Sequence, residues 1–346
     1  MTSRDSKGAL TIGVLQSRLI DAAQARYPGA VVRAVVPLEG GASSLTFRAE
    51  LVIEGTVSGI VVKVAPPGRE PVRNRDVLRQ ARIMTTLASD GRLPVPTVIF
   101  SDLGDPPAIP PLFAMNFIPG DSAEPLFDEL PTSQLDAAHG PSAEDVSRRA
   151  HHAAALLAAL QQTDLDAPAF VDEAVWTPAD EVKRWSAALA TVDAGCVDGW
   201  PRCRDALLAN QPGAAPPVLC HGDYRLGNML AVAGGVEAII DWELWGIGDP
   251  RFDLAWLRMN ADPGIYRRAT RLGASMPSPD ALLESYSRSF GATVVDLDWF
   301  DALARFKTVA TWALILKHAG TAGRQRFESV RSILPGLLVD VVCRLG

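Results

Sequence analysis

The sequence lacks the features that mark several common protein classes. It has only four cysteines and no C-x-x-C pair, so neither a disulfide framework nor a structural zinc site is expected. This cysteine usage favours a reducing, cytoplasmic location. No run approaches ~18 consecutive apolar residues, and the first ten residues have charges but no apolar core. Neither a membrane span nor a signal peptide is therefore expected.

Charge and missing motifs exclude further classes. The formal net charge is -7, which argues against nucleic acid or an anionic membrane as the main partner. No GxxxxGK[ST], GxGxxG, HExxH or GxSxG motif is present, so P-loop, dinucleotide-binding, zinc-protease and serine-hydrolase sites have no support. What remains is a globular chain of 346 residues, 48% of them hydrophobic, which is long enough for two domains. The sequence does not indicate an oligomeric state.

The hydrophobic pattern changes about a third of the way along the chain. The elements predicted before the change are a helix over 11–27, strands over 31–36, 45–54, 60–64 and 112–118, turns at Gly40-Gly41 and over 55–59, a helix over 74–88 and extended chain over 94–100. Pro119-Gly120 ends this part, and from 143 onward the pattern is mainly helical, with one β segment near 216–245. The expected fold is α+β, with a small antiparallel β lobe over 1–118 and a larger helical lobe over 119–346.

The segment from His221 to Asn228 is the most informative for chemistry. Asp223 and Asn228 have the D-x-x-x-x-N spacing of a kinase catalytic loop, where the aspartate meets the substrate hydroxyl and the asparagine holds Mg²⁺. A carboxylate can orient an alcohol and accept its proton, and an amide oxygen can bind a hard cation without adding charge. Taken alone, the H-G-D triplet is also compatible with an ordinary turn.

A predicted hairpin follows this loop. If Gly234-Gly235 forms its turn, Asn228 lies opposite Asp241 at the open end. An amide and a carboxylate would then meet, which is the oxygen pair that a Mg²⁺–nucleotide complex needs.

Two N-terminal features fit a phosphate site. Glycines between the first two strands let backbone N–H groups approach phosphates closely, although most Gly-Gly pairs are plain hairpin turns. Lys63 lies in the apolar strand 60–64, after a glycine-rich turn and before a helix, where a kinase-like lobe places its phosphate-binding lysine. The alternative for Lys63 is an exposed lysine on an edge strand.

Together these segments resemble the aminoglycoside phosphotransferase and choline kinase-like enzymes, which have a bilobal protein-kinase-like fold. The resemblance covers roughly residues 30–320. It includes Pro94-Val95-Pro96, the strand from Phe113 to Gly120, the catalytic loop, and Ile240-Asp241-Trp242-Glu243 followed by Gly248-Asp249-Pro250 and Asp253-Leu254-Ala255. The last two blocks are closest to the branch associated with acyl-CoA dehydrogenases.

The resemblance implies a role for each matching residue. Asp223 would be the catalytic base or orienting carboxylate, Asn228 and Asp241 would bind Mg²⁺, and Asp249 and Asp253 would be structural. The residues implied to contact ATP are Gly40, Gly41, Ser43, Ser44, Lys63, Met115 and Phe117. One departure concerns the glutamate that pairs with the lysine in this family, because Gln80 stands at its position. Asp76 or Glu70 could substitute for it.

The expected function is ATP- and Mg²⁺-dependent phosphoryl transfer to a hydroxyl of a small molecule. A nucleotide-binding protein without transfer activity is the alternative, motivated by Gln80. A protein kinase is disfavoured because the chain has no A-P-E motif. The acceptor would be a hydroxylated metabolite, for example a hydroxyacyl thioester, or an aminoglycoside-like molecule. The basic residues that could favour an acyl-CoA-type acceptor are Arg267, Arg268, Arg271, Lys307, Lys317, Arg324 and Arg326.

Overall fold

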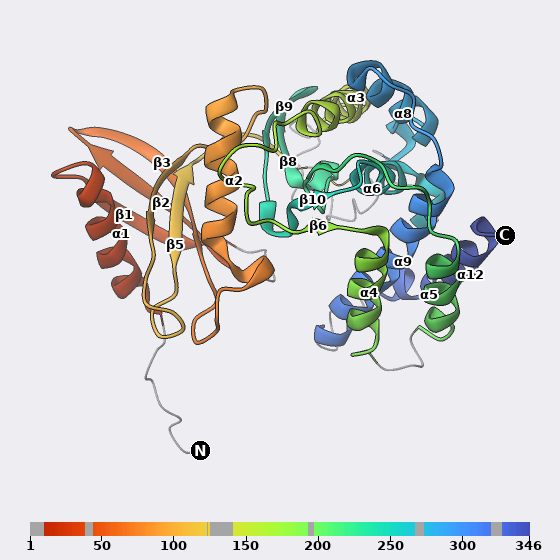
Figure 1. Cartoon of the computed structure of the whole chain (residues 1–346). Helices are drawn as coiled ribbons and strands as arrows, with labels where there is room; N and C mark the ends of the chain where they lie inside the picture. Colours follow the sequence, from red (N-terminus) through yellow and green to blue (C-terminus); the bar gives the residue numbers. More distant parts are fainter. Residues whose placement is uncertain are drawn as a thin grey trace, which may run out of the picture. The chain divides into compact units, whose positions relative to one another are not determined.

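The computed structural model describes residues 10–38, 44–122, 124, 141–192, 197–266, 273–319 and 327–346. The chain divides into two compact units (Figure 1). The first comprises Met1–Gly120, Ala167–Ala169 and Glu237–Trp245, and the second comprises Asp121–Asp166, Phe170–Val236 and Gly246–Gly346. The lobe boundary at residues 118 and 119 stays a prediction.

The first unit is built on a five-stranded antiparallel sheet in the order β1-β2-β3-β5-β4. Its elements are α1 (Ile12–Arg26), β1 (Val31–Pro37), β2 (Leu45–Ile53), β3 (Thr56–Val64), η1 (Arg73–Arg75), α2 (Val77–Asp90), β4 (Val98–Asp102), β5 (Leu112–Asn116) and η4 (Trp242–Leu244). Figure 1 shows α1 and α2 on either side of this sheet. The predicted antiparallel β lobe is present.

Alternation along β3 decides which side chains face each helix. Ile60, Val62 and Val64 are buried in one core with Leu15 and Leu19 of α1. Because successive side chains of a strand point to opposite faces, Lys63 points to the other face of the sheet. The strand that fills the core therefore also directs its lysine away from that core.

The β2–β3 turn is tighter than the sequence suggested. Ile53 pairs with Thr56, so the turn consists of Glu54 and Gly55, both at positive φ (50° and 80°). The predicted turn over 55–59 is wrong, because β3 already begins at Thr56. Gly59 serves packing instead, since a Cβ there would lie 3.2 Å from the side chain of Phe117.

Helix α2 also begins later than predicted. Asp76 caps it, accepting a hydrogen bond from the backbone N–H of Arg79 at 3.0 Å, and the first helical residue is Val77 rather than residue 74. At the other end Gly91 adopts the left-handed conformation that commonly ends a helix.

The second unit is mainly helical. Its elements are α3 (Ala143–Leu160), β6 (Val175–Trp176), α4 (Pro178–Leu189), α5 (Trp200–Ala209), β7 (Val218–Cys220), η3 (Leu226–Asn228), β8 (Met229–Val232), β9 (Gly235–Ile239, whose last residues belong to the first unit), β10 (Gly246–Gly248), α6 (Arg251–Ala261), α7 (Pro263–Tyr266), η5 (Gly273–Ser275), α8 (Pro279–Phe290), α9 (Leu297–His318), α11 (Glu328–Arg331) and α12 (Leu334–Arg344). Helix α9 is central to one core, which also takes buried residues from α4, α5, α6 and α12. In the part of the chain described here, no helix is both long and apolar enough to cross a bilayer.

Two small β elements place the loop of interest. A three-stranded sheet, β6-β10-β7, leads the chain through β7 into His221, and β8 and β9 form the hairpin that follows. The hairpin turn lies at Ala233 and Gly234 rather than at Gly234-Gly235. This shift by one residue removes the register argument that placed Asn228 directly opposite Asp241.

Candidate active site

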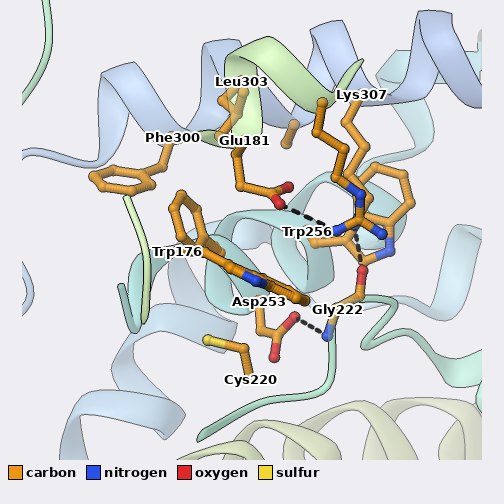
Figure 2. Close-up of a pocket in the computed structure, with 12 residues that line it drawn as sticks. Trp176, Glu181, Cys220, Gly222, Asp253, Trp256, Phe300, Leu303 and Lys307 are labelled. Atoms are coloured by element: carbon orange, nitrogen blue, oxygen red, sulfur yellow. Dashed lines mark hydrogen bonds and ion pairs between the residues drawn. The ribbon is translucent and has the colours of Figure 1, made fainter. Parts of the chain in front are cut away.

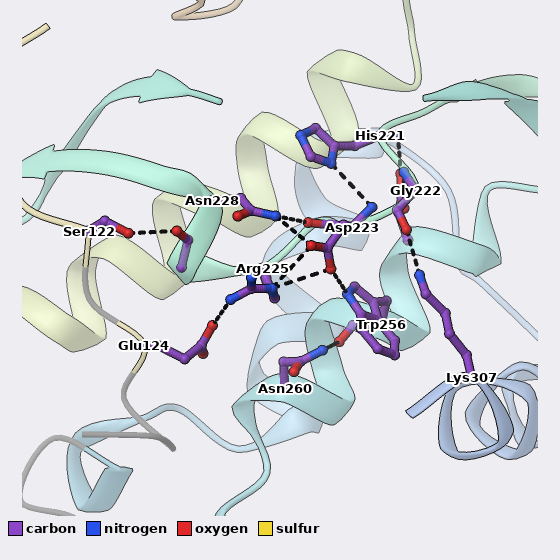
Figure 3. A network of polar contacts seen from close by, with 12 residues as sticks. Ser122, Glu124, His221, Gly222, Asp223, Arg225, Asn228, Trp256, Asn260 and Lys307 are labelled. Atoms are coloured by element: carbon purple, nitrogen blue, oxygen red, sulfur yellow. Dashed lines mark hydrogen bonds and ion pairs between the residues drawn. The ribbon is translucent and has the colours of Figure 1, made fainter. Parts of the chain in front are cut away.

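The turn that begins the predicted catalytic loop is held from both sides (Figure 3). The carboxylate of Asp253 on α6 accepts the backbone N–H groups of His221 at 2.6 Å and Gly222 at 3.0 Å. Lys307 on α9 donates to the carbonyl oxygen of Gly222 at 2.5 Å. Gly222 has φ 83°, a conformation that glycine adopts without strain. Two helices thus fix the backbone immediately before Asp223.

Asp223 is surrounded by donors. Oδ1 accepts the indole N–H of Trp256 at 2.7 Å, Oδ2 accepts the amide of Asn228 at 2.7 Å, and Nε of Arg225 lies 3.3 Å from both oxygens. Burial raises the pKa of Asp223, but the charges of Arg225 and Lys307 outweigh it, so this pKa lies below its ordinary value. The carboxylate is therefore ionised at neutral pH, and it can orient a hydroxyl group by accepting its hydrogen bond.

Asn228 has an orientation that suits a metal ligand. Its amide nitrogen donates to the backbone oxygen of Asp223 at 2.9 Å and to Oδ2 of the same residue. Because the nitrogen is directed at Asp223, the amide oxygen faces away from it as an acceptor. Oxygen donors of this kind are what Mg²⁺ prefers.

Asp241 belongs to the first unit, and its carboxylate forms an ion pair with Lys63 at 2.6 Å. The lysine side chain is 12% exposed and that of Asp241 is 33% exposed, so the pair is partly shielded from water. Asp241 has φ 66°, in the left-handed region. One carboxylate oxygen is bonded to Lys63, and the carboxylate offers further acceptor positions to a cation.

The residues expected to pair with Lys63 do not do so. Asp76 is the cap of α2, Gln80 is buried with its amide nitrogen 3.5 Å from the carbonyl of Asn74, and Glu70 is exposed. The partner is Asp241, 178 positions further along the chain. Lys63 therefore has a carboxylate partner even though α2 lacks the glutamate.

The residues present fit a magnesium–nucleotide complex in their chemistry. Among the described residues no three His, Cys, Asp or Glu side chains cluster as a metal site. Mg²⁺ in nucleotide sites is commonly held by one or two protein ligands together with phosphates and water. Asp241 of the first unit offers a carboxylate and Asn228 of the second unit offers an amide oxygen, and both are ligand types that Mg²⁺ takes.

The other predicted nucleotide contacts are spread over the first unit. Gly40, Gly41 and Ser43 lie outside the described residues. Ser44 is buried, and its hydroxyl oxygen makes no hydrogen bond within the described part of the chain. In β5, Met115 pairs with Val61 and Val98, and the backbone N–H of Phe117 donates to the carbonyl oxygen of Gly59 at 3.0 Å.

A small cavity of about 20 Å³ in the second unit opens beside the catalytic loop (Figure 2). It is lined by Trp176, Glu181, Arg184, Cys220, Gly222, Phe252, Asp253, Trp256, Phe300, Leu303, Ala304 and Lys307. Trp256 connects it to the loop, because its ring forms part of the wall and its indole N–H binds Asp223. A cavity of this size has room for about one water molecule.

The charges at this cavity are engaged by neighbouring groups. Glu181 accepts the indole N–H of Trp185 at 2.9 Å and a guanidinium N–H of Arg184 at 3.1 Å, and Asp253 is occupied by the catalytic turn. Lys307 is half-buried, with its Nζ 3.8 Å from the ring centroid of Trp256. Burial lowers the pKa of Lys307, and the nearby carboxylates oppose that shift. Both cations of the wall are engaged as well, Arg184 with Glu181 and Lys307 with the carbonyl oxygen of Gly222, so the two carboxylates and the two cations balance.

Sequence reasoning missed two residues of this network and singled out a third only loosely. Arg225, which binds Asp223 and also pairs with Glu124, lies two positions after the aspartate, and that proximity was a usable signal. Trp256 directly follows the Asp253-Leu254-Ala255 block. Lys307 was one of seven basic candidates. Lys317, another of these, is exposed and donates to the carbonyl of Thr191.

Comparison with known proteins assigns the family. The model of the phosphotransferase enzyme family matches residues 34–284. The chain belongs to this family. The predicted kinase-like α+β fold is confirmed by solved structures, all under 25% identical to this chain. A putative aminoglycoside phosphotransferase from Ralstonia eutropha is 20% identical with a TM-score of 0.71, over 94% of this chain and 97% of the other.

Two further relatives extend this comparison. The macrolide 2'-phosphotransferase MphH from Brachybacterium faecium is 22% identical with a TM-score of 0.52, over 92% of this chain and 98% of the other. The mouse (Mus musculus) acyl-CoA dehydrogenase family member 10 is 29% identical over 202 residues, which is 57% of this chain. The chain spans only 18% of that relative's length. The similarity to the mouse protein thus concerns one part of a much longer chain.

Proposed function

We propose that the protein is an ATP- and Mg²⁺-dependent kinase that transfers the γ-phosphate to a hydroxyl group of a small molecule. The observation that carries this proposal is the Asp223–Asn228 arrangement, in which one side chain is an ionised carboxylate and the other turns its amide oxygen outward. Family membership supports the reaction class. Phosphoryl transfer needs mainly positioning and neutralisation of charge, which these residues can supply.

Each residue has a distinct task in this proposal. Asp223 orients the acceptor hydroxyl, whose oxygen forms the new bond to phosphorus while the bond to ADP breaks. The hydroxyl proton passes to Asp223 or to water as this bond forms. Asn228 and Asp241 would hold Mg²⁺, which neutralises phosphate charge when bound. Lys63 would contact the α- and β-phosphates.

The remaining nucleotide contacts stay as predicted from sequence. The loop with Gly40, Gly41, Ser43 and Ser44 would lie against the phosphates, and the β5 segment with Met115 and Phe117 would meet adenine. Within the described residues the buried hydroxyl of Ser44 makes no hydrogen bond, which supports its part in this assignment. A burial of this kind without a partner is costly, so a ligand oxygen or a water molecule is expected there.

The cavity supports a hydroxylated metabolite, neutral or anionic, as the acceptor. A polycation such as an aminoglycoside would need unpaired carboxylates, whereas Glu181 is paired with Arg184 and Asp253 accepts the backbone N–H groups of the catalytic turn. The relatives named acyl-CoA dehydrogenase family members make a hydroxyacyl thioester one such candidate. The alternative acceptor class comes from a related structure solved with AMP-PNP and hygromycin B.

Thermal unfolding with ATP tests the proposal. A ligand that binds only the folded state raises stability by RT ln(1 + [L]/Kd), so the shift in Tm reports affinity. We expect ATP to raise Tm more with Mg²⁺ than with EDTA, and Asp241→Ala to lose the Mg²⁺-dependent part. A wild-type protein that neither ATP nor GTP stabilises at millimolar concentration would overturn the proposal in favour of a role without nucleotide.

An acceptor panel follows from the same experiment. Product formation with MgATP is measured for neutral and anionic hydroxylated metabolites, hydroxyacyl thioesters and aminoglycosides. Phosphorylation of aminoglycosides alone would overturn the preferred acceptor class and leave the kinase proposal intact. ATP binding without transfer to any class would favour the non-catalytic alternative.

A further inference from the structure

No carboxylate of helix α2 pairs with Lys63. A different contact connects this helix to the segment that follows Asp241. The residue beside Gln80 provides one. Arg79 of α2 contacts Trp245, 166 positions further along the chain, and both residues lie in the first unit. Neither Arg79 nor Trp245 is one of the nucleotide or acceptor residues already described.

Hydrogen bonds and a ring contact join Arg79 and Trp245. A guanidinium N–H of Arg79 donates to the backbone oxygen of Trp245 at 2.9 Å, and the indole N–H of Trp245 donates back to the carbonyl oxygen of Arg79 at 3.3 Å. The guanidinium carbon lies 3.9 Å from the centroid of the indole ring, which is the geometry of a cation–π contact. Trp245 is fully buried, so these interactions are shielded from water.

The segment between Asp241 and Trp245 is short and constrained. Asp241 has φ 66°, and a residue other than glycine holds that conformation only when its surroundings enforce it. The indole N–H of Trp242, the residue after Asp241, donates to the carbonyl of Ile239, two residues before Asp241, at 2.9 Å. The short helix η4 then runs from Trp242 to Leu244 and leads to Trp245.

These restraints converge on the orientation of one carboxylate. The backbone before Asp241 is held through Ile239, whose N–H donates to the carbonyl of Pro94 at 2.8 Å. The backbone after it is held through Trp245 by Arg79. The side chain itself meets Lys63. Of these restraints, only the one from Arg79 brings in helix α2.

We infer that Arg79 is a positioning residue, which fixes the metal-binding carboxylate of Asp241 by clamping Trp245 to α2. In relatives a glutamate of this helix would connect the helix to the site through the lysine. Here Arg79 would make that connection by stacking on Trp245 and by hydrogen bonding to it. This inference rests on the proposed Mg²⁺–ATP site. It predicts that loss of the clamp weakens the binding of Mg²⁺ in the ATP complex more than the binding of ATP alone.

The test compares Arg79→Met with Arg79→Lys and with Arg82→Met in the full chain. Arg82 is an exposed arginine three positions further along the same helix, so its variant controls for lost charge on α2. For each protein, Tm is measured with ATP in EDTA and with ATP over a series of Mg²⁺ concentrations. Hydrogen exchange of the peptide covering 240–246 is measured in parallel.

For Arg79→Met we expect an unchanged shift with ATP in EDTA and a half-saturating Mg²⁺ concentration raised about tenfold, as for other outer-sphere partners of metal ligands. Exchange should accelerate over 240–246 and stay unchanged over 297–318. Arg79→Lys should fall between this variant and wild type, because lysine retains the charge but not the planar fork. Arg82→Met should match wild type.

Three results would overturn the inference. One is an Arg79→Met protein with the wild-type Mg²⁺ dependence. Another is an equal loss of the EDTA and Mg²⁺ shifts, which would mark a general structural role. If Arg79→Met does not fold, an Arg79→Lys protein indistinguishable from wild type in Mg²⁺ dependence and in exchange would be decisive against it. Absence of any ATP shift in wild type would instead overturn the proposed function, and the inference with it.

Discussion

Trp256 donates its indole N–H to the carboxylate of Asp223 at 2.7 Å. With the amide of Asn228 and the single Nε–H of Arg225, which is shared between both oxygens, the carboxylate has three donors for about four acceptor positions. An acceptor hydroxyl can take the remaining position or replace one of the donors. The Arg225 contacts, at 3.3 Å, are the weakest of the set, and Arg225 has a second partner in Glu124. Of the three donors, Arg225 is therefore the least costly to displace.

Replacing Asp223 tests its role most directly. Asp223→Asn keeps the shape of the side chain but removes its charge. We expect kcat to fall by about 10²–10⁴-fold, the usual scale for a lost acid–base group, while the shift of Tm by ATP persists. Steady-state kinetics with the acceptor found in the panel gives the number. Turnover close to that of wild type would rule out the assigned role.

Removing one hydrogen bond from Trp256 should separate positioning from packing. Trp256→Phe retains an aromatic ring in the cavity wall but has no N–H for Asp223. A hydrogen bond to a charged group contributes about 1.5–3 kcal/mol, so kcat should fall by about 10–100-fold. Binding of ATP should not change. A lower stability with unaltered kcat would show that the indole serves only the fold.

Two lysines of α9 offer a matched pair for stability. Lys307 is half-buried against Trp256 and donates to Gly222, whereas Lys317 is exposed and donates to Thr191. Lys307→Met removes the hydrogen bond to Gly222 and one positive charge near the carboxylates of Asp223 and Asp253. We therefore expect its free energy of unfolding, measured in urea, to fall by about 3 kcal/mol.

Lys317→Met is the control, because an exposed substitution of this kind changes the free energy of unfolding by at most about 0.5 kcal/mol. Equal effects of the two substitutions would show that the amine of Lys307 has no special role. A more stable Lys307→Met protein would mean that the cost of burying this charge exceeds the benefit of its contacts.

Thiol reactivity should distinguish the cysteines of the described residues. Burial raises the pKa of Cys203 to about 11, and the buried thiol of Cys220 is also raised, whereas Cys343 is exposed. At pH 8 only about one Cys203 thiol in a thousand is ionised. In a Cys196→Ser background, Ellman's reagent should react quickly with one thiol and reach the others only after unfolding. Two fast thiols in the folded protein would contradict this assignment.

The sequence predicted the antiparallel β lobe and the helical remainder because apolar periodicity is a local property of the chain. The D-x-x-x-x-N spacing also indicated Asp223 and Asn228, since the loop that joins them is local. Asp253 was expected to bond the catalytic loop, and it does so through His221 and Gly222. Each of these predictions depended on residues close together in the sequence or on a family pattern.

What the sequence could not indicate depended on packing. The hairpin turn lies at Ala233, whose φ of 49° is unusual for alanine, while Gly234 is required because a Cβ there would meet Arg148. Gly234 is a turn residue as predicted and also makes space, whereas Gly235 begins β9 instead of completing the turn. The partner of Lys63 was sought on the nearby helix, whereas Asp241 comes from 178 positions away. Long-range pairs of this kind are not visible in a single sequence.

The cavity beside the catalytic loop has two walls with different duties. Asp253 and Lys307 hold the backbone of the catalytic turn, so most substitutions of either would disturb the reaction. Trp176 and Arg184 line the same cavity without bonding that turn. Mutation can therefore reshape the second wall while the turn keeps its geometry. We therefore expect acceptor specificity to change in evolution through substitutions in β6 and α4 rather than in α6 and α9.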